Sequence, residues 1–119
     1  PTAAELLDAI AELLEKEVID AVSGPVQHKV RVAANLARIL QRESELGPQT
    51  IERERAVVTG LLDRSDDGTD LLTLRGELAN RLRQSDPADE RVTWAALVEI
   101  TKGDLAIAKP GHAEWTGDA

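Results

Sequence analysis

Aliphatic side chains recur every three or four residues along almost the whole 119-residue chain. This spacing places them on one side of an α-helix, whereas an exposed β-strand would need strict alternation. The chain has no Phe, Tyr, Met or Cys and only two Trp, so Leu, Val, Ile and Ala must fill the interior. The pattern predicts an all-α protein, and the length predicts a single domain around one core.

Capping and stop signals divide this pattern into five helices. Thr2 and Glu5 match a capping box at the start of the first. Gly47 and Pro48 predict an end to the second near Leu46, through a left-handed cap followed by a residue that cannot continue the helix. The first predicted helix runs from 2 to the Ser-Gly-Pro at 23–25, the second from 26 to about 46, and the third over about 49–62. The fourth runs from 70 to 83, with Thr69 or Asp70 as its cap. The fifth runs from the Asp86 cap to Lys109, and Pro110 ends it.

The short connections between these helices predict how the domain is arranged. Helices joined by short loops pack as antiparallel neighbours, so we expect a five-helix up-and-down bundle over residues 1–110. Residues 111–119 are expected to form a C-terminal tail. An irregular orthogonal array of the same helices is the alternative architecture.

The last predicted helix has apolar residues on two sides. Trp94, Val98 and Leu105 fall on one side. The nearly opposite side carries Val92, Ala96, Ile100, Gly103 and Ile107. Such a helix either lies at the centre of its own bundle or buries its second side against another molecule. We therefore expect either a central helix or a homodimer whose interface contains Trp94, Val98 and Leu105.

The formal net charge of −8 limits the classes of partner. Binding to nucleic acid or to an anionic membrane surface requires a basic surface, so neither partner is expected. No apolar run approaches the roughly 20 residues needed to span a bilayer, and the residues from Pro1 onward show no pattern of an export signal, so export is not expected. The sequence predicts a cytoplasmic protein.

Polar side chains form a stripe along the second predicted helix. Steps of three and four residues bring the stripe within one arc of the helix. A solvated face is one interpretation; a site for a carboxylate or phosphate group of a ligand or partner is the other, because arginine binds both groups. The stripe consists of His28, Arg31, Asn35, Arg38 and Arg42.

Three charged residues lie on the sides of predicted helices that otherwise carry apolar residues. Glu17 shares the arc of the first helix that faces the expected core, and Arg75 does so on the fourth helix. Because a buried charge requires a partner, the spacing predicts a Glu17–Arg75 or Glu17–Arg31 ion pair, unless these side chains lie at the rim and reach water. Glu99 on the fifth helix raises the same question.

The sequence matches none of the catalytic or metal-binding motifs considered. No glycine-rich phosphate loop is present, and His28 and His112 stand alone without the spacing of a metal motif. No catalytic residue, cofactor or metal site is therefore predicted.

Four segments together resemble a bacterial family of small proteins known only as a domain of unknown function. They are "PTAAELLDAIAELLEKEV", "HKVRVAANLARILQRESELGP", "LRGELANRLR" and "DLAIAKP". The resemblance implies a short helical protein, encoded beside kinases of the aminoglycoside or choline phosphotransferase type and beside acyl-CoA dehydrogenases. It implies no activity, and the tail with His112 and Trp115 does not match. We expect a non-catalytic accessory or interaction domain that binds itself or such an enzyme; a small-ligand binding protein or minor enzyme is the alternative.

Overall fold

The computed structural model describes residues 1–84 and 87–112, with the side chains of 1–84 and 90–112. Every regular element among them is helical. The first three elements join without a break through residues in α-helical conformation, so the described chain contains four principal helices. The elements are α1 (Ala3–Leu13), the π-helical turn η1 (Leu14–Val18), α2 (Ile19–Ala21), α3 (Gly24–Leu61), α4 (Leu71–Arg83), α5 (Pro87–Ala108) and the 3₁₀ turn η2 (Pro110–His112).

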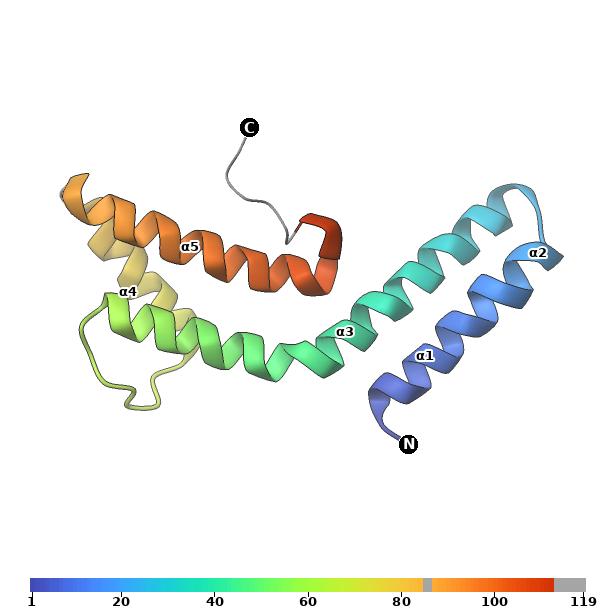
Figure 1. Cartoon of the computed structure of the whole chain (residues 1–119), viewed down its shortest axis with the longest axis horizontal. Coiled ribbons are helices and arrows are strands. Elements are labelled where there is room, and N and C mark those ends of the chain that lie inside the picture. The colour runs from blue at the N-terminus through green and yellow to red at the C-terminus, as the bar shows by residue number, and fades with distance from the viewer. Residues whose placement is uncertain (85–86, 113–119) are drawn as a thin grey trace.

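The predicted all-α class is confirmed, but the five-helix up-and-down bundle is wrong. The second and third predicted helices are one helix of 38 residues, α3, which contains Pro48 in its interior. Gly47 is buried, and it is not one of the glycines in left-handed conformation, which are Gly24 and Gly68. The predicted cap therefore does not form, and α3 bends near its middle without ending (Figure 1).

Contacts from α5 on both sides of Pro48 explain why α3 continues. Before the proline, Arg42 Nε donates to the carbonyl oxygen of Ile107 at 2.7 Å. After it, Gly103 lies so close to Thr50 that an added Cβ would stand 3.4 Å from the threonine methyl. A proline inside a helix removes one hydrogen bond and its ring clashes with the preceding turn, which favours a kink or a break. Because α5 holds both halves of α3, the packing favours the kink.

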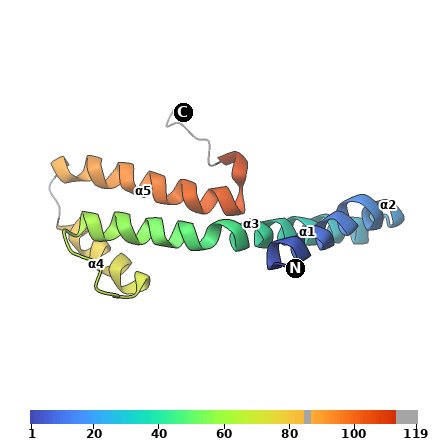
Figure 2. The same ribbon diagram turned by 60° about the horizontal axis from the view of Figure 1, so that its bottom comes forward.

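The helices divide between the two halves of α3. The α1–η1–α2 helix runs antiparallel along the first half, and α5 runs antiparallel along the second half with α4 on another side (Figures 1 and 2). The molecule measures 58 × 37 × 21 Å and has a radius of gyration of 18.9 Å. A compact domain of this length would have about 13.5 Å. The fold is therefore elongated.

Two separate packing regions replace the single expected core. The second half of α3 contributes Val58 to a cluster with Leu74 and Leu78 of α4. In the first half, Ala11 of α1 is buried and α3 presents small side chains. Close packing of alanines brings two helices together without covering their flanks, so large aliphatic side chains stay exposed on both. The buried residues of α3 in this region are Val30, Ala34 and Ala37.

Several helix ends form where local signals predicted them. Thr2 and Glu5 form the expected capping box, with Thr2 N donating to Glu5 Oε2 at 3.0 Å and Glu5 N donating to Thr2 Oγ1 at 3.1 Å. Asp70 is the N-cap of α4 and accepts a hydrogen bond from Thr73 N. The predicted cap Asp86 lies outside the described residues. In the described part of the chain no helix combines the length and apolar character needed to cross a membrane.

Candidate functional site

The inner side of α5 packs against α3 and thereby sets the position of its outer side. Ile100 packs against the Val58 cluster, and Gly103 allows close approach to Thr50. The carbonyl of Ile107 accepts the hydrogen bond from Arg42. The first apolar side of this helix is thus covered within the chain from Ile100 to Ile107, whereas Val92 on the same side stays exposed.

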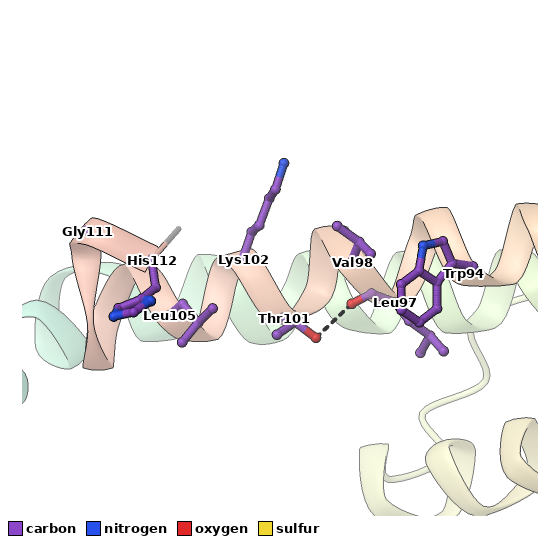
Figure 3. Close-up of a pocket in the computed structure, with 8 residues that line it drawn as sticks. All are labelled: Trp94, Leu97, Val98, Thr101, Lys102, Leu105, Gly111 and His112. Carbon is purple, nitrogen blue, oxygen red and sulfur yellow. Dashed lines mark hydrogen bonds between the residues drawn. The ribbon is translucent and has the colours of Figure 1, made fainter. Parts of the chain in front are cut away.

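The outer side of α5 forms an open groove of about 520 Å³. Trp94 and His112 lie at its two ends, and apolar side chains of α5 lie between them (Figure 3). Trp94 is 65% exposed, while Val98 and Leu105 are half-buried. The groove brings the three predicted interface residues together on one exposed surface. Its lining consists of Trp94, Leu97, Val98, Thr101, Lys102, Leu105, Gly111 and His112.

Few polar atoms of the groove are free to bind a ligand. Thr101 Oγ1 already donates to the carbonyl oxygen of Leu97 at 2.8 Å. Lys102 extends away from the helix, with Nζ 3.6 Å from Glu99 Oε1. The groove therefore offers mainly apolar area, with an amine at the rim and the His112 imidazole at one end.

Sequence reasoning missed His112 because it assigned that residue to a tail. In the structure the chain turns at Pro110, and His112 N donates to the carbonyl oxygen of Lys109 at 2.9 Å. The succession Pro110-Gly111 after a helix is a turn signal. The Pro110-Gly111 turn signal predicts that the chain reverses after α5 and brings His112 back toward this helix. Trp115 lies outside the described residues.

The stripe from His28 to Arg42 separates into structural and solvated residues. Arg38 donates to Glu15 through Nε at 3.0 Å and through Nη2 at 2.9 Å, and it also pairs with Asp8. These bonds tie α3 to the α1–η1 helix and raise the pKa of Arg38, chiefly through the hydrogen bonds to Glu15 and Asp8. Arg42 is used in the contact with α5. The other members, which are exposed, are His28, Arg31 and Asn35.

The predicted ion pair of Glu17 is not the one that forms. Arg75 of α4 pairs with Glu54 of α3, with Nε–Oε1 2.6 Å and Nη2–Oε2 2.8 Å. Glu17 is exposed, because the arc that it shares with Leu6 and Ile10 faces away from α3 and is itself half-exposed. The α1–η1 helix and α4 also pack on different halves of α3, so Glu17 does not meet Arg75.

Helical spacing could have found Glu54. It lies three residues after Ile51 and four before Val58, which is the signal that singled out Glu17. Glu54 also acts on Asp104 of α5, whose pKa is raised by burial and by the charge of Glu54.

Glu99 is exposed and lies beside Lys102. In residues 1–84 and 87–112 no group of three or more His, Cys, Asp or Glu side chains is arranged to hold a metal ion.

Comparison with known proteins adds a family but no activity. A family model described as "Domain of unknown function (DUF6285)" matches residues 20–112. No curated protein and no solved structure is significantly similar to the chain. The matched region includes all of α3, α4 and α5, and therefore the whole groove.

Proposed function

Because the chain belongs to the DUF6285 family, whose description names no activity, we propose from the structure that it is a non-catalytic protein-interaction domain. Its binding surface in this proposal is the groove on the outer side of α5. The observation that carries the proposal is Trp94, a large aromatic side chain that is 65% exposed at one end of an apolar groove. Aromatic side chains in such positions are typical anchors of protein interfaces.

Burial of Trp94 would contribute favourable energy to docking at the groove. An aromatic side chain buries about 150–250 Å², so covering the exposed part of Trp94 removes on the order of 100 Å² from water. At about 25 cal/mol per Å² this contributes ~2.5 kcal/mol, before Val98 and Leu105 are counted. The groove thus has the main feature of an interaction hot spot, an aromatic anchor with apolar neighbours.

The shape of the groove favours an amphipathic helix of another protein as the occupant. Trp94, Val98 and Leu105 extend over about 16 Å of α5, which corresponds to three helical turns. A helix that docks in a groove uses apolar anchors three, four and seven residues apart. An amphipathic helix of another protein can present such anchors along the whole length of the groove. We therefore assign the groove to a different protein.

The class of that protein rests on the resemblance noted in the sequence. Phosphotransferase-like kinases and enzymes of acyl-CoA metabolism are the proposed partners. Binding of a small anionic ligand by the arginine stripe is less well supported, because Arg38 and Arg42 are used in contacts within the chain. The proposal therefore concerns a protein partner.

Comparative capture from the native host tests this function. The wild-type chain and a Trp94→Ser variant would be used as baits, and the retained proteins would be quantified by mass spectrometry. Val92→Ser is a matched control, since Val92 is also 65% exposed on α5 but does not line the groove. We expect one protein to be retained by the wild type and by Val92→Ser and lost with Trp94→Ser. Equal retention by all three baits would contradict the proposal.

A further inference from the structure

A second exposed stripe follows the first half of α3. At 100° per residue its five members fall within an arc of about 80°. Leu36, at its middle, is 54% exposed, and the residues on either side of it are exposed as well. The stripe consists of Lys29, Val32, Leu36, Leu40 and Glu43.

The chain itself does not cover this stripe. The α1–η1 helix packs against the side of α3 that carries the buried Ala34. Leu36 is two residues further along the helix, so it projects about 200° away from that side. The contacts of α5 with α3 described above begin at Arg42. Three apolar side chains therefore form an open surface along a helix that the chain supports from the opposite side.

The order of residues in the stripe is symmetric in position and complementary in charge. Lys29 and Glu43 each stand seven residues from Leu36, and Val32 and Leu40 each stand four residues from it. Neither Lys29 nor Glu43 has an ion-pair partner among the residues that the structure describes. An antiparallel copy of the stripe would thus present an opposite charge to each end.

We propose that α3 binds a second copy of this chain, with the two stripes antiparallel and Leu36 at the two-fold axis. Val32 of one copy then contacts Leu40 of the other, and Lys29 pairs with Glu43 at both ends. A two-fold interface must be self-complementary, and this register meets that condition. The α5 groove is not part of this contact, so the proposal goes beyond the proposed function.

The expected interface is modest in size. The stripe spans 14 residue steps, or about 21 Å of helix, which is short for an interface of standard area. Small interfaces are typical of assemblies that dissociate on dilution. The net charge of −8 on each copy opposes association, and salt screens that repulsion, so the dimer should strengthen as ionic strength rises from low values.

Disulfide trapping tests the register, because the natural chain has no cysteine. In the antiparallel register position 32 lies beside position 40 of the other copy. Two residues at position 32 are then separated by about 12 Å along the helix, which exceeds the roughly 7 Å that a disulfide can span. Under mild oxidation we expect Val32→Cys alone and Leu40→Cys alone to remain uncrosslinked, whereas their mixture forms a covalent dimer.

Two further variants test the position of the two-fold axis and the specificity of the crosslinking. Leu36→Cys should crosslink with itself, and Leu72→Cys, exposed on α4 away from the stripe, should not. Circular dichroism verifies that each variant is folded. Self-crosslinking of Val32→Cys would overturn the antiparallel register. Absence of a product both from the 32/40 mixture and from Leu36→Cys would overturn the α3 dimer.

Exchanging charges provides an independent test. Lys29→Glu places like charges together at both ends of the interface and should weaken association about tenfold in sedimentation experiments at low salt. The double variant Lys29→Glu/Glu43→Lys should restore it. Lys16→Glu on the other helix makes the same change in net charge and should have less effect. Equal weakening by Lys16→Glu, or no restoration in the double variant, would contradict the pairing of Lys29 with Glu43.

Discussion

Glu54 on α3 and Arg75 on α4 form a two-point ion pair in which the Glu54 side chain is 7% exposed and the Arg75 side chain is 52% exposed. If one partner were removed, water could therefore hydrate the remaining side chain to a different extent in the two cases. Arg75 can be hydrated on its exposed side if Glu54 is removed. Glu54 has no such route if Arg75 is removed.

This asymmetry predicts unequal costs of the two substitutions. Arg75→Ala leaves a buried carboxylate without its partner and should lower the free energy of unfolding by about 3 kcal/mol. Glu54→Gln keeps the shape of the side chain and removes the charge, so it should cost about 1 kcal/mol. Urea denaturation measures both. Equal costs would show that burial of Glu54 does not control the energetics of this pair.

Asp104 predicts a pH dependence of stability. Its pKa lies above the ordinary value of 3.8 in the folded protein, because of burial first and the charge of Glu54 second. The folded state then holds a proton that the unfolded state has released, so stability falls as pH rises from about 3.8 through the folded pKa. Asp104→Asn should raise the denaturation midpoint at pH 7 and have no effect below the unfolded pKa. A loss of stability at pH 7 would contradict this.

Arg38 is predicted to stabilise the fold, in contrast to its neighbour in the polar stripe. Arg38→Ala removes the bonds to Glu15 and Asp8 that join two helices, from a side chain that is partly buried. We expect a cost of about 1–2 kcal/mol, whereas Arg31→Ala at an exposed position should cost less than about 0.5 kcal/mol. Similar thermal midpoints for the two variants would contradict a structural role of Arg38.

Trp94 should be dispensable for folding. Because its side chain is largely exposed, Trp94→Glu should retain the helical circular dichroism signal and a thermal midpoint close to that of the wild type. The variant should also retain the self-association assigned to α3. Unfolding of this variant would place Trp94 in the core of the chain and would remove the basis for the proposed groove.

The features predicted correctly from the sequence depend on neighbouring residues. The Thr2–Glu5 capping box, the Asp70 cap and the end of α5 before Pro110 each involve interactions over three or four residues. Such interactions are encoded locally, so spacing and residue type are sufficient to identify them. The two-sided character of α5 was predicted in the same way.

The features that were missed depend on contacts between distant segments. Pro48 is a strong helix breaker, and the contacts of α5 at Arg42 and Thr50 favour the continuation of α3 through it. Once the break was assumed, the two halves of α3 were expected to pack side by side in a bundle. In such a bundle the apolar arcs that contain Glu17 and Arg75 would face one core, whereas in the structure they lie on different halves of the molecule.

The continuity of α3 underlies both proposed surfaces, because it separates the two halves of the molecule and leaves these faces open. Spin labels at Asn35→Cys and Gly60→Cys test it, since Asn35 is exposed and a Cβ at Gly60 would meet open space. Labelled protein would be diluted with unlabelled chain, so that only distances within one molecule are measured. Along one helix the 25 residue steps correspond to about 37 Å, slightly less with the bend. Electron–electron dipolar spectroscopy should give a distance near this value, whereas about 10 Å, the spacing of adjacent helices in a bundle that turns at Gly47, would contradict the account.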